Sequence, residues 1–296
     1  MSRTKSPRMQ ATYFTICLAA LALAACSIQA QTAPSSKPSQ GAEVSANASA
    51  SQSEDAAAKD AAQNPVAAAI SVPFQNNTYY DVGPYRRAEN QLLIEPVIPI
   101  KLSDRWIVIS RTITPVVVVP RRSPGEGVDY GLSNIQPQFY LSPAHPGKFI
   151  WGVGPQLWLP TATDKTLGTN KWGGGPALVG LIHQGHWLGG SLLSNQFAGV
   201  NHTHVNQMLI NPFLFYNMKH GYYFVTTPVI TADWTQQRSQ RWTVPVGGGV
   251  GRVFKVGPQP LNARAEFFNN VRTTNGGSSW QMQVQLQFLF IQKKKR

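Results

Sequence analysis

Hydrophobic and polar residues alternate strictly through WQMQVQLQFLF, residues 280–290. One face carries the bulky apolar side chains of Trp280, Met282, Val284, Leu286, Phe288 and Phe290. The opposite face carries Gln281, Gln283, Gln285, Gln287 and Leu289. A period of two is typical of a β-strand whose two faces meet different surroundings. Uncharged amides opposite an unbroken apolar face, over a length that crosses a bilayer as a tilted strand, predict a barrel strand between lipid and a polar lumen.

Similar runs of strand length fill the chain from residue 71 onward. The predicted strands are 71–82, 91–100, 106–117, 134–142, 149–160, 174–183, 186–197, 205–217, 222–233, 241–254, 261–271 and 280–290. Short turns alternate with longer connections, as in barrels that keep short turns in the periplasm and long loops outside. If strand 280–290 runs from the outside to the periplasm, the alternation makes strand 91–100 run in the same direction. A strand running outward must then precede it, and we assign this strand to 71–82 and its outer loop to 83–90. We therefore predict an all-β transmembrane antiparallel up-and-down barrel of about twelve strands, with ten as the alternative.

Several residues disturb this regular pattern. Prolines inside predicted strands each remove a ladder hydrogen bond; they are Pro96, Pro99, Pro115, Pro137, Pro155, Pro176, Pro212, Pro228 and Pro245. Arg111 and Arg252 fall on otherwise apolar faces. The neighbouring strands 222–233 and 241–254 combine breakers at Pro228, Pro245, Gly247, Gly248 and Gly249. They predict a lateral opening or kinked wall there; the alternative is that they only bend the sheet so that it can close.

The N-terminal region predicts export. Basic residues precede an apolar run over 13–25, which is typical of a secretory signal. The run ends in Leu-Ala-Ala-Cys at Cys26, which resembles a lipobox, in which the cysteine is acylated. The signal region is then 1–26. The alternative is cleavage after Ala30. Residues 27–63 are of low complexity and predict a disordered linker. The barrel then occupies 64–296. Because the other cysteine, Cys17, lies inside the signal, the mature chain can form no internal disulfide.

Charge narrows the class of protein further. Only 13% of the 296 residues are charged, and no apolar run after the N-terminus reaches the length of a membrane-spanning helix. The net charge of +13 comes from scattered turn residues and the tail at 293–296. No basic helix or stacking-aromatic motif accompanies these charges, so we expect no nucleic-acid partner.

Candidate catalytic and metal-binding residues are sparse. His183, His186, His202 and His204 have no cysteine or carboxylate at ligand spacing, so we interpret them as solvated and expect no metal or other cofactor. No nucleophile elbow, phosphate loop or zinc-protease motif is present. Ser191 and Ser194 near His186 are the nearest approach to the Ser–His pair of lipid-cleaving barrels. We expect that the protein is not an enzyme.

Polar residues on the predicted inner face are better candidates for function. If Gln283, Gln285 and Gln287 point inward, the inner face of the preceding strands should include Asp233, Arg264 and Glu266. These charges either pair to fill a narrow pore or line a permeation path and set its selectivity. In the loop PTATD, Thr161, Thr163 and Asp164 are expected to cap a turn, with substrate contact as the alternative.

The loop motif also supports a family resemblance. GVGPQLWLPTATDKTLGTNKWGGGPALVGL (152–181), which includes Trp172, resembles the signature of the meta-pathway phenol-degradation-like family of outer-membrane transporters. Matching stretches lie at 64–77, 109–117, 131–143, 207–217 and 242–262, so the resemblance covers about residues 64–290. It implies an outer-membrane β-barrel that passes small, often hydrophobic or aromatic compounds. The lipobox-like N-terminus and the IQKKKR extension after Phe290 depart from the family pattern.

We therefore expect a bacterial outer-membrane channel or transporter for small hydrophobic or aromatic solutes. Its expected partners are outer-membrane lipid, the solute and the barrel-assembly machinery. Two alternatives stay open: a structural or binding protein that transports nothing, and a lipid-modifying enzyme.

Overall fold

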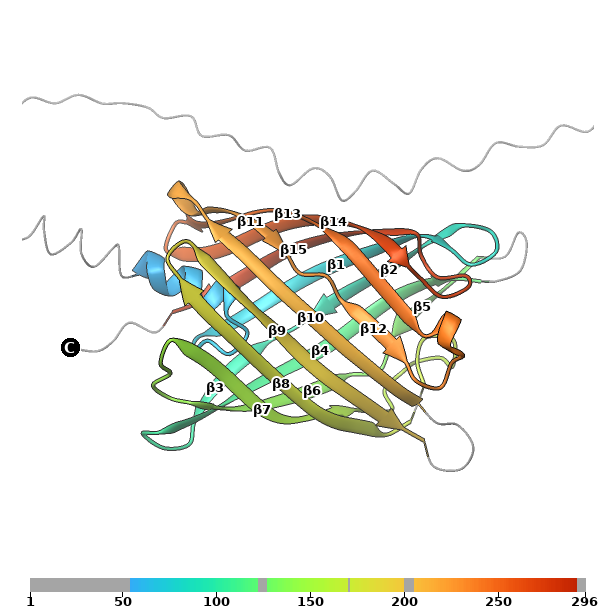
Figure 1. The fold of residues 1–296 in the computed structure, drawn as a ribbon, viewed down its shortest axis with the longest axis horizontal. Helices are drawn as coiled ribbons and strands as arrows, with labels where there is room; N and C mark the ends of the chain where they lie inside the picture. The colour runs from blue at the N-terminus through green and yellow to red at the C-terminus, as the bar shows by residue number, and fades with distance from the viewer. Residues whose placement is uncertain (1–53, 122–126, 170, 200–204, 292–296) are drawn as a thin grey trace, which may run out of the picture. The chain divides into compact units, whose positions relative to one another are not determined.

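The computed structural model describes residues 54–121, 127–169, 171–199 and 205–291 (Figure 1). The chain divides by its own contacts into two units, and all of these residues belong to the second, Asn47–Arg296. The predicted signal region with Cys26, most of the predicted linker, and His202 and His204 lie outside the described residues. Within the described ranges, no helix is both long enough and apolar enough to span a bilayer.

The described strands form one antiparallel sheet. They are β1 (Ile70–Val82), β2 (Arg87–Ile94), β3 (Val97–Lys101), β4 (Trp106–Pro120), β5 (Val128–Leu132), β6 (Gln136–Pro143), β7 (Phe149–Trp158), β8 (Gly173–Gln184), β9 (Trp187–Ala198), β10 (Val205–Asn217), β11 (Tyr222–Thr226), β12 (Ile230–Asp233), β13 (Trp242–Val256), β14 (Gln259–Arg272) and β15 (Trp280–Phe290). Each pairs with its neighbours, and β1 pairs with β15 from Ile70 to Tyr80, which closes the sheet. Because β2–β3, β5–β6 and β11–β12 are each one interrupted strand, the closed barrel has twelve strands, and this prediction is confirmed.

The two ends of the barrel differ in the length of their connections. One end, the short-turn end, carries the turns 102–105, 144–148, 185–186, 218–221 and 257–258, with 3-10 helix η1 (Lys219–Gly221) in one of them. The other, the long-loop end, carries the longer connections β4–β5, β7–β8, β9–β10, β14–β15 and β12–β13, the last of which includes η2 (Arg238–Gln240). The predicted outer loop 83–90 is wrong in extent, because β2 already begins at Arg87. Gly83 at φ 72° allows the tight reversal before it.

Residues 54–63 fall in the predicted linker, yet they form a helix (blue in Figure 1). Ala58 and Ala61 are buried against Leu289 of β15. Lys255 of β13 pairs with Asp55 at 2.9 Å. The composition predicted no burial here, because alanines offer little apolar surface. However, alanine has a high helix propensity, and a helix with small side chains fits into the narrow end of a barrel.

The two faces of the sheet separate as the alternation predicts. On β15, Val284 and Leu286 are 37% and 40% exposed on the outer wall, while Gln283, Gln285 and Gln287 are buried on the inner one. Exposed apolar side chains continue around the barrel and include Phe74, Leu157, Leu178, Leu193, Leu214, Phe224, Val250 and Phe267. A belt of this kind is what a membrane-spanning barrel presents to lipid.

Candidate functional site: the lumen and its interrupted wall

A cavity of about 370 Å³ lies inside the barrel. Its polar wall comes from carboxamide side chains on β15, β1 and their neighbours, because alternate residues of these strands face inward. The lining amides include Gln75, Asn77, Gln91, Gln136, Gln138, Gln156, Gln196, Gln207, Asn211, Gln283, Gln285 and Gln287. Gln207, near the long-loop end of β10, is exposed, so the cavity meets solvent on that side. The predicted inward direction of the β15 glutamines is therefore what the structure shows.

Apolar side chains fill the lumen towards the short-turn end. Val66, which follows the helix, is buried within an inner cluster drawn from strands β4 to β11. The cluster contains Ile107, Ile109, Tyr140, Ala177, Val179, Leu181, Leu188, Leu192, Phe213, Phe215, Tyr223 and Val225. Gln63 exchanges amide hydrogen bonds with Asn217 of β10 at 2.9 and 3.0 Å, which fixes the segment in place. The lumen is therefore amphipathic, and its short-turn half is packed.

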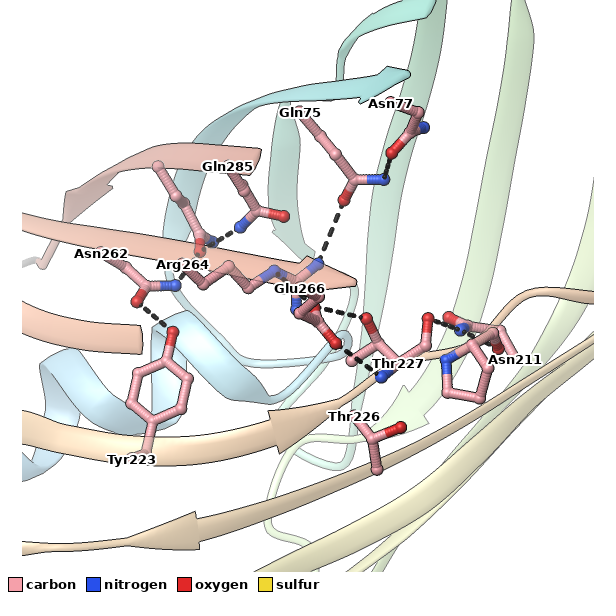
Figure 2. A network of polar contacts seen from close by, with 12 residues as sticks. Gln75, Asn77, Asn211, Tyr223, Thr226, Thr227, Asn262, Arg264, Glu266 and Gln285 are labelled. Carbon is pink, nitrogen blue, oxygen red and sulfur yellow. Dashed lines mark hydrogen bonds and ion pairs between the residues drawn. The ribbon is translucent and has the colours of Figure 1, made fainter. Parts of the chain in front are cut away.

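Two ion pairs lie inside the lumen. Arg264 lies 3.4 Å from the fully buried carboxylate of Glu266 and donates a hydrogen bond to the Gln75 side chain at 3.1 Å (Figure 2). A second pair joins Arg111 of β4 to Glu95 at 2.6 Å. This second contact shows that Arg111 lies on the inner wall. Two neutralised pairs leave the surface of the cavity dominated by neutral amides.

The barrel wall is interrupted between β11 and β12. Residues 227–229 leave the ladder, while β10 pairs normally on both sides, at Leu214–Thr226 and Ile210–Ile230. On the other edge, pairing with β13 stops at Val225–Gly249 and resumes at Thr231–Thr243. The wall therefore contains a local break in its backbone hydrogen bonding, away from either end of the strand.

Side chains bridge the two edges of this break (Figure 2). Glu266 accepts hydrogen bonds from the backbone N–H and the hydroxyl of Thr227, both at 2.8 Å. Asn211 of β10 donates to the carbonyls of Thr227 and Pro228 at 3.2 and 2.9 Å. The hydroxyl of Thr226 donates to the carbonyl of Gly247 at 2.8 Å. Side-chain bonds thus replace the missing ladder.

The predicted wall breakers have distinct places around the break. Pro228 lies inside it, and the register of β13 against β14 shifts between Val244 and Pro245. Gly247 and Gly248 lie along the unpaired edge of β13, and Gly249 is the last residue of β13 that pairs with β11 before the break. A Cβ at Gly249 would lie 1.8 Å from the carbonyl oxygen of Ala265, so only glycine fits there. Gly249 pairs directly with Glu266, and its missing side chain leaves the carboxylate free to reach Thr227.

Other predicted residues divide between the cavity and the loops. Arg264 lines the cavity, and Glu266 is buried beside it. Asp233 does not belong to the described lining: it ends β12, and its carboxylate accepts hydrogen bonds from the backbone N–H and hydroxyl of Thr235. A short polar residue before a turn often makes such local bonds instead of pointing along its strand face.

The PTATD motif forms local turn contacts. Thr161 accepts a hydrogen bond from the backbone N–H of Ile135 and donates one to the carbonyl of Ser133. Hydrogen bonds from the backbone N–H and hydroxyl of Thr166 lower the pKa of Asp164. Thr163 donates weakly, at 3.5 Å, to the carbonyl of Leu132. None of these three residues lines the cavity among the described residues.

Asn134 and Trp172 complete this outer region. The buried amide of Asn134 donates to the carbonyl of Leu159 and accepts from the N–H of Thr169, which ties the loop to the strands below it. Asn134 falls in the stretch 131–143 that carries the family resemblance, but the sequence did not single it out as a loop anchor. Trp172 is 69% exposed and lines a separate surface hollow beside Phe197 and Trp234.

The serines and histidines of the predicted alternatives do not form a catalytic pair. Ser194 is buried in the lumen, whereas Ser191 lies on the other face of β9 because adjacent strand residues point to opposite sides. His186, in the turn before β9, has its Nδ1 2.9 Å from the carbonyl oxygen of Asn217. Across the described ranges, no three His, Cys, Asp or Glu side chains gather as a metal site would require.

Comparisons with known proteins extend the description of the fold. No protein-family model matches the chain, and no curated protein matches it. The COG4313 outer membrane channel from Pseudomonas putida F1 superposes with a TM-score of 0.56 at 13% identity, over 75% of this chain and 94% of the other. The NanC porin gives 0.48 at 9% identity over 76% and 100%. Outer membrane phospholipase A from Escherichia coli gives 0.42 at 10% over 74% and 90%. At 13% identity, the likeness to the COG4313 channel shows the barrel fold alone.

Proposed function

We propose that this protein is a bacterial outer-membrane channel for small apolar or aromatic solutes, which leave its lumen sideways through the wall at residues 227–229. The observation that carries the proposal is the break in the ladder between β11–β12 and β13, beside a lumen whose short-turn half is packed. A straight aqueous path through the barrel is obstructed by Val66 and the cluster around it. The wall break offers the shorter route into an apolar phase.

The cavity suits a small, weakly polar molecule. Its volume of about 370 Å³ lies at the small end of the range of ligand pockets. Apolar side chains such as Leu209 and Phe213 face amides such as Gln283 and Gln285 across the lining. A solute with one hydrogen-bonding group and an apolar body can satisfy both sides. Ionic solutes gain little, because the lumen arginines already pair with Glu95 and Glu266.

Side-chain hydrogen bonds close the break in this structure, which supports a second candidate function: a structural or binding protein that transports nothing. Glu266, Asn211 and Thr226 together replace the missing ladder bonds, as they would in a permanently closed wall. The two candidates differ in whether these side-chain bonds open. Lipid cleavage has less support, because His186 bonds to Asn217 and not to either serine.

Flux through purified protein in liposomes tests the proposal. A phenol-sized aromatic probe and a hydrophilic sugar of similar size would be followed into protein-containing and protein-free vesicles loaded with a fluorescent reporter. We expect protein-dependent transfer of the aromatic probe and little transfer of the sugar. Equal rates with and without protein for both solutes would support the sealed barrel, and lysophospholipid release would support an enzyme.

A further inference from the structure

Arg252 of β13 points out of the barrel. Its antiparallel partners are Tyr222 on one side and Ala263 on the other, and directly paired residues share a face of the sheet. Tyr222 is 46% exposed on the outer wall, whereas the next residue, Tyr223, is fully buried in the lumen. The surrounding outer wall is apolar, with Phe224 and Val250 more than half exposed. Arg252 is therefore a cation on the lipid-facing side.

The guanidinium of Arg252 has no anionic partner among the described residues. Its central carbon lies 4.6 Å from the centre of the Tyr222 ring, a cation–π contact that holds the group against the wall. No described protein group accepts a hydrogen bond from its nitrogen atoms. Arginine stays charged and carries five N–H donors, and polar groups at a lipid surface require acceptors. No residue in the described ranges supplies that acceptor, which leaves the position open to a group from the membrane.

The position of Arg252 along the strand suggests where that acceptor lies. Tyr222 is the first residue of β11, and β13 ends soon after Arg252, at Val256, so both residues are near the short-turn end. Gly221 of the adjacent turn packs against the carbonyl of Val253, which brings the exposed Lys219 to the same corner of the barrel. In membrane-spanning barrels, lipid headgroups meet the hydrocarbon region near the ends of the strands.

We propose that Arg252 and Tyr222 form a binding site for the phosphate of a phospholipid in the leaflet at the short-turn end. The planar guanidinium can donate two parallel hydrogen bonds to phosphate oxygens, while the Tyr222 ring covers its other face. The exposed side chains of Phe224 and Val250 then lie along the lipid's acyl chains. This proposal rests on the membrane location in the proposed function, but not on transport or on the wall break.

Native mass spectrometry of the purified full-length barrel tests this site. The protein would be titrated with dioleoylphosphatidylglycerol and, separately, with a galactosyl diacylglycerol that has similar chains and no phosphate. Arg252→Gln removes the charge from the wall. Arg105→Gln, in the exposed turn 102–105, removes one charge from the same end of the barrel and serves as the matched control.

We expect Arg252→Gln to weaken binding of the phospholipid about tenfold, the loss of one charge-assisted interaction. Binding of the galactolipid should be unchanged, and Arg105→Gln should match the unsubstituted protein for both lipids. Heat-modifiable gel mobility would verify that each variant is folded. Equal phospholipid affinity of folded Arg252→Gln and the unsubstituted protein would overturn the proposal, as would an equal loss in Arg105→Gln. The flux of aromatic probe reports on the proposed function independently.

Discussion

The carboxylate of Glu266 binds Thr227 across an intervening strand. Glu266 belongs to β14 and Thr227 lies between β11 and β12, and Figure 2 shows the two hydrogen bonds between them. The contact crosses β13 at Gly249, which pairs directly with Glu266. One of the two hydrogen bonds satisfies the backbone N–H of Thr227, which the interrupted ladder leaves without a partner strand, and the other comes from the Thr227 hydroxyl. An acidic side chain thus does the work of backbone pairing, and its removal should act on the break more than on the rest of the barrel.

Replacing Glu266 with alanine should loosen the wall. The change leaves the Thr227 N–H without its acceptor and Arg264 without its carboxylate, at a cost of about 3 kcal/mol in unfolding free energy. Urea unfolding in detergent measures this loss, and aromatic-probe flux should rise in the variant. Glu266→Gln keeps a hydrogen-bond acceptor of the same shape. Its unfolding free energy and flux should therefore lie between those of the alanine variant and the unsubstituted protein. A folded Glu266→Ala protein with unchanged flux argues against opening at this place.

A disulfide across the interrupted wall should stop lateral release. Thr231 and Thr243 are direct partners on β12 and β13. Opposed residues of this kind lie about 4.5–5.5 Å apart at Cα, within disulfide range. In a Cys26→Ala background, the cysteine pair at 231 and 243 should reduce aromatic-probe flux when oxidised, and a reductant should restore it.

A second cysteine pair controls for general stiffening. Ala265 and Val284 are direct partners on the uninterrupted β14–β15 wall. Oxidation of cysteines at those positions should leave flux unchanged. Equal inhibition by both pairs would show that the wall at 227–229 has no special part in release.

The two faces of β15 should differ sharply in their tolerance of charge. Leu286 faces outward, so Leu286→Arg places a cation on the lipid side and should destabilise the barrel by roughly 2–4 kcal/mol if it lies near the membrane centre. Gln283→Arg places the same group in the lumen opposite Glu266 and should assemble. Heat-modifiable mobility of outer-membrane fractions measures both. Position 285 is unsuitable as the inward control, because it lies directly opposite Arg264.

Docking of the helix at 54–63 should strengthen in acid. Burial raises the pKa of Asp60 above its ordinary value of 3.8, although a hydrogen bond from Asn64 opposes the shift. The folded state therefore favours the protonated carboxyl, and stability is greatest below that value and declines as pH rises through the raised pKa. Hydrogen exchange, corrected for intrinsic rates, should show more protection of this helix at low pH. Asp60→Asn should keep high protection at all pH values; protection that falls in acid would contradict this reasoning.

Acylation of Cys26 is a separate prediction of the N-terminal sequence. Cells fed a clickable fatty acid should label the unsubstituted protein and not Cys26→Ala. A mature chain that begins at Gln31 by mass spectrometry would instead establish cleavage after Ala30. The test concerns the anchor alone, and either result is compatible with the barrel.

The barrel itself could be predicted from the sequence because its evidence is local. A period of two, such as that of 280–290, determines which side chains share a face wherever the strand lies in space. Alternating connection lengths then determined the parity of the strands. The inward glutamines and the outward Leu286 followed directly. Pro228 and Gly249 also indicated the interrupted wall. Proline lacks the N–H that a ladder hydrogen bond requires, and glycine has no side chain to pack within a strand.

Only the tertiary structure showed what holds that interruption closed and what fills the lumen. The Glu266–Thr227 contact joins residues on non-adjacent strands, and no periodicity within either strand encodes it. The alanine-rich helix at 54–63 folds because the barrel end buries it, which composition alone cannot reveal. Asp233 is paired with the lumen residue Gln207, but its carboxylate bonds locally to Thr235 and is not among the described lining residues of the cavity. Sequence patterns determine the faces of strands, whereas contacts between distant strands depend on closure of the sheet.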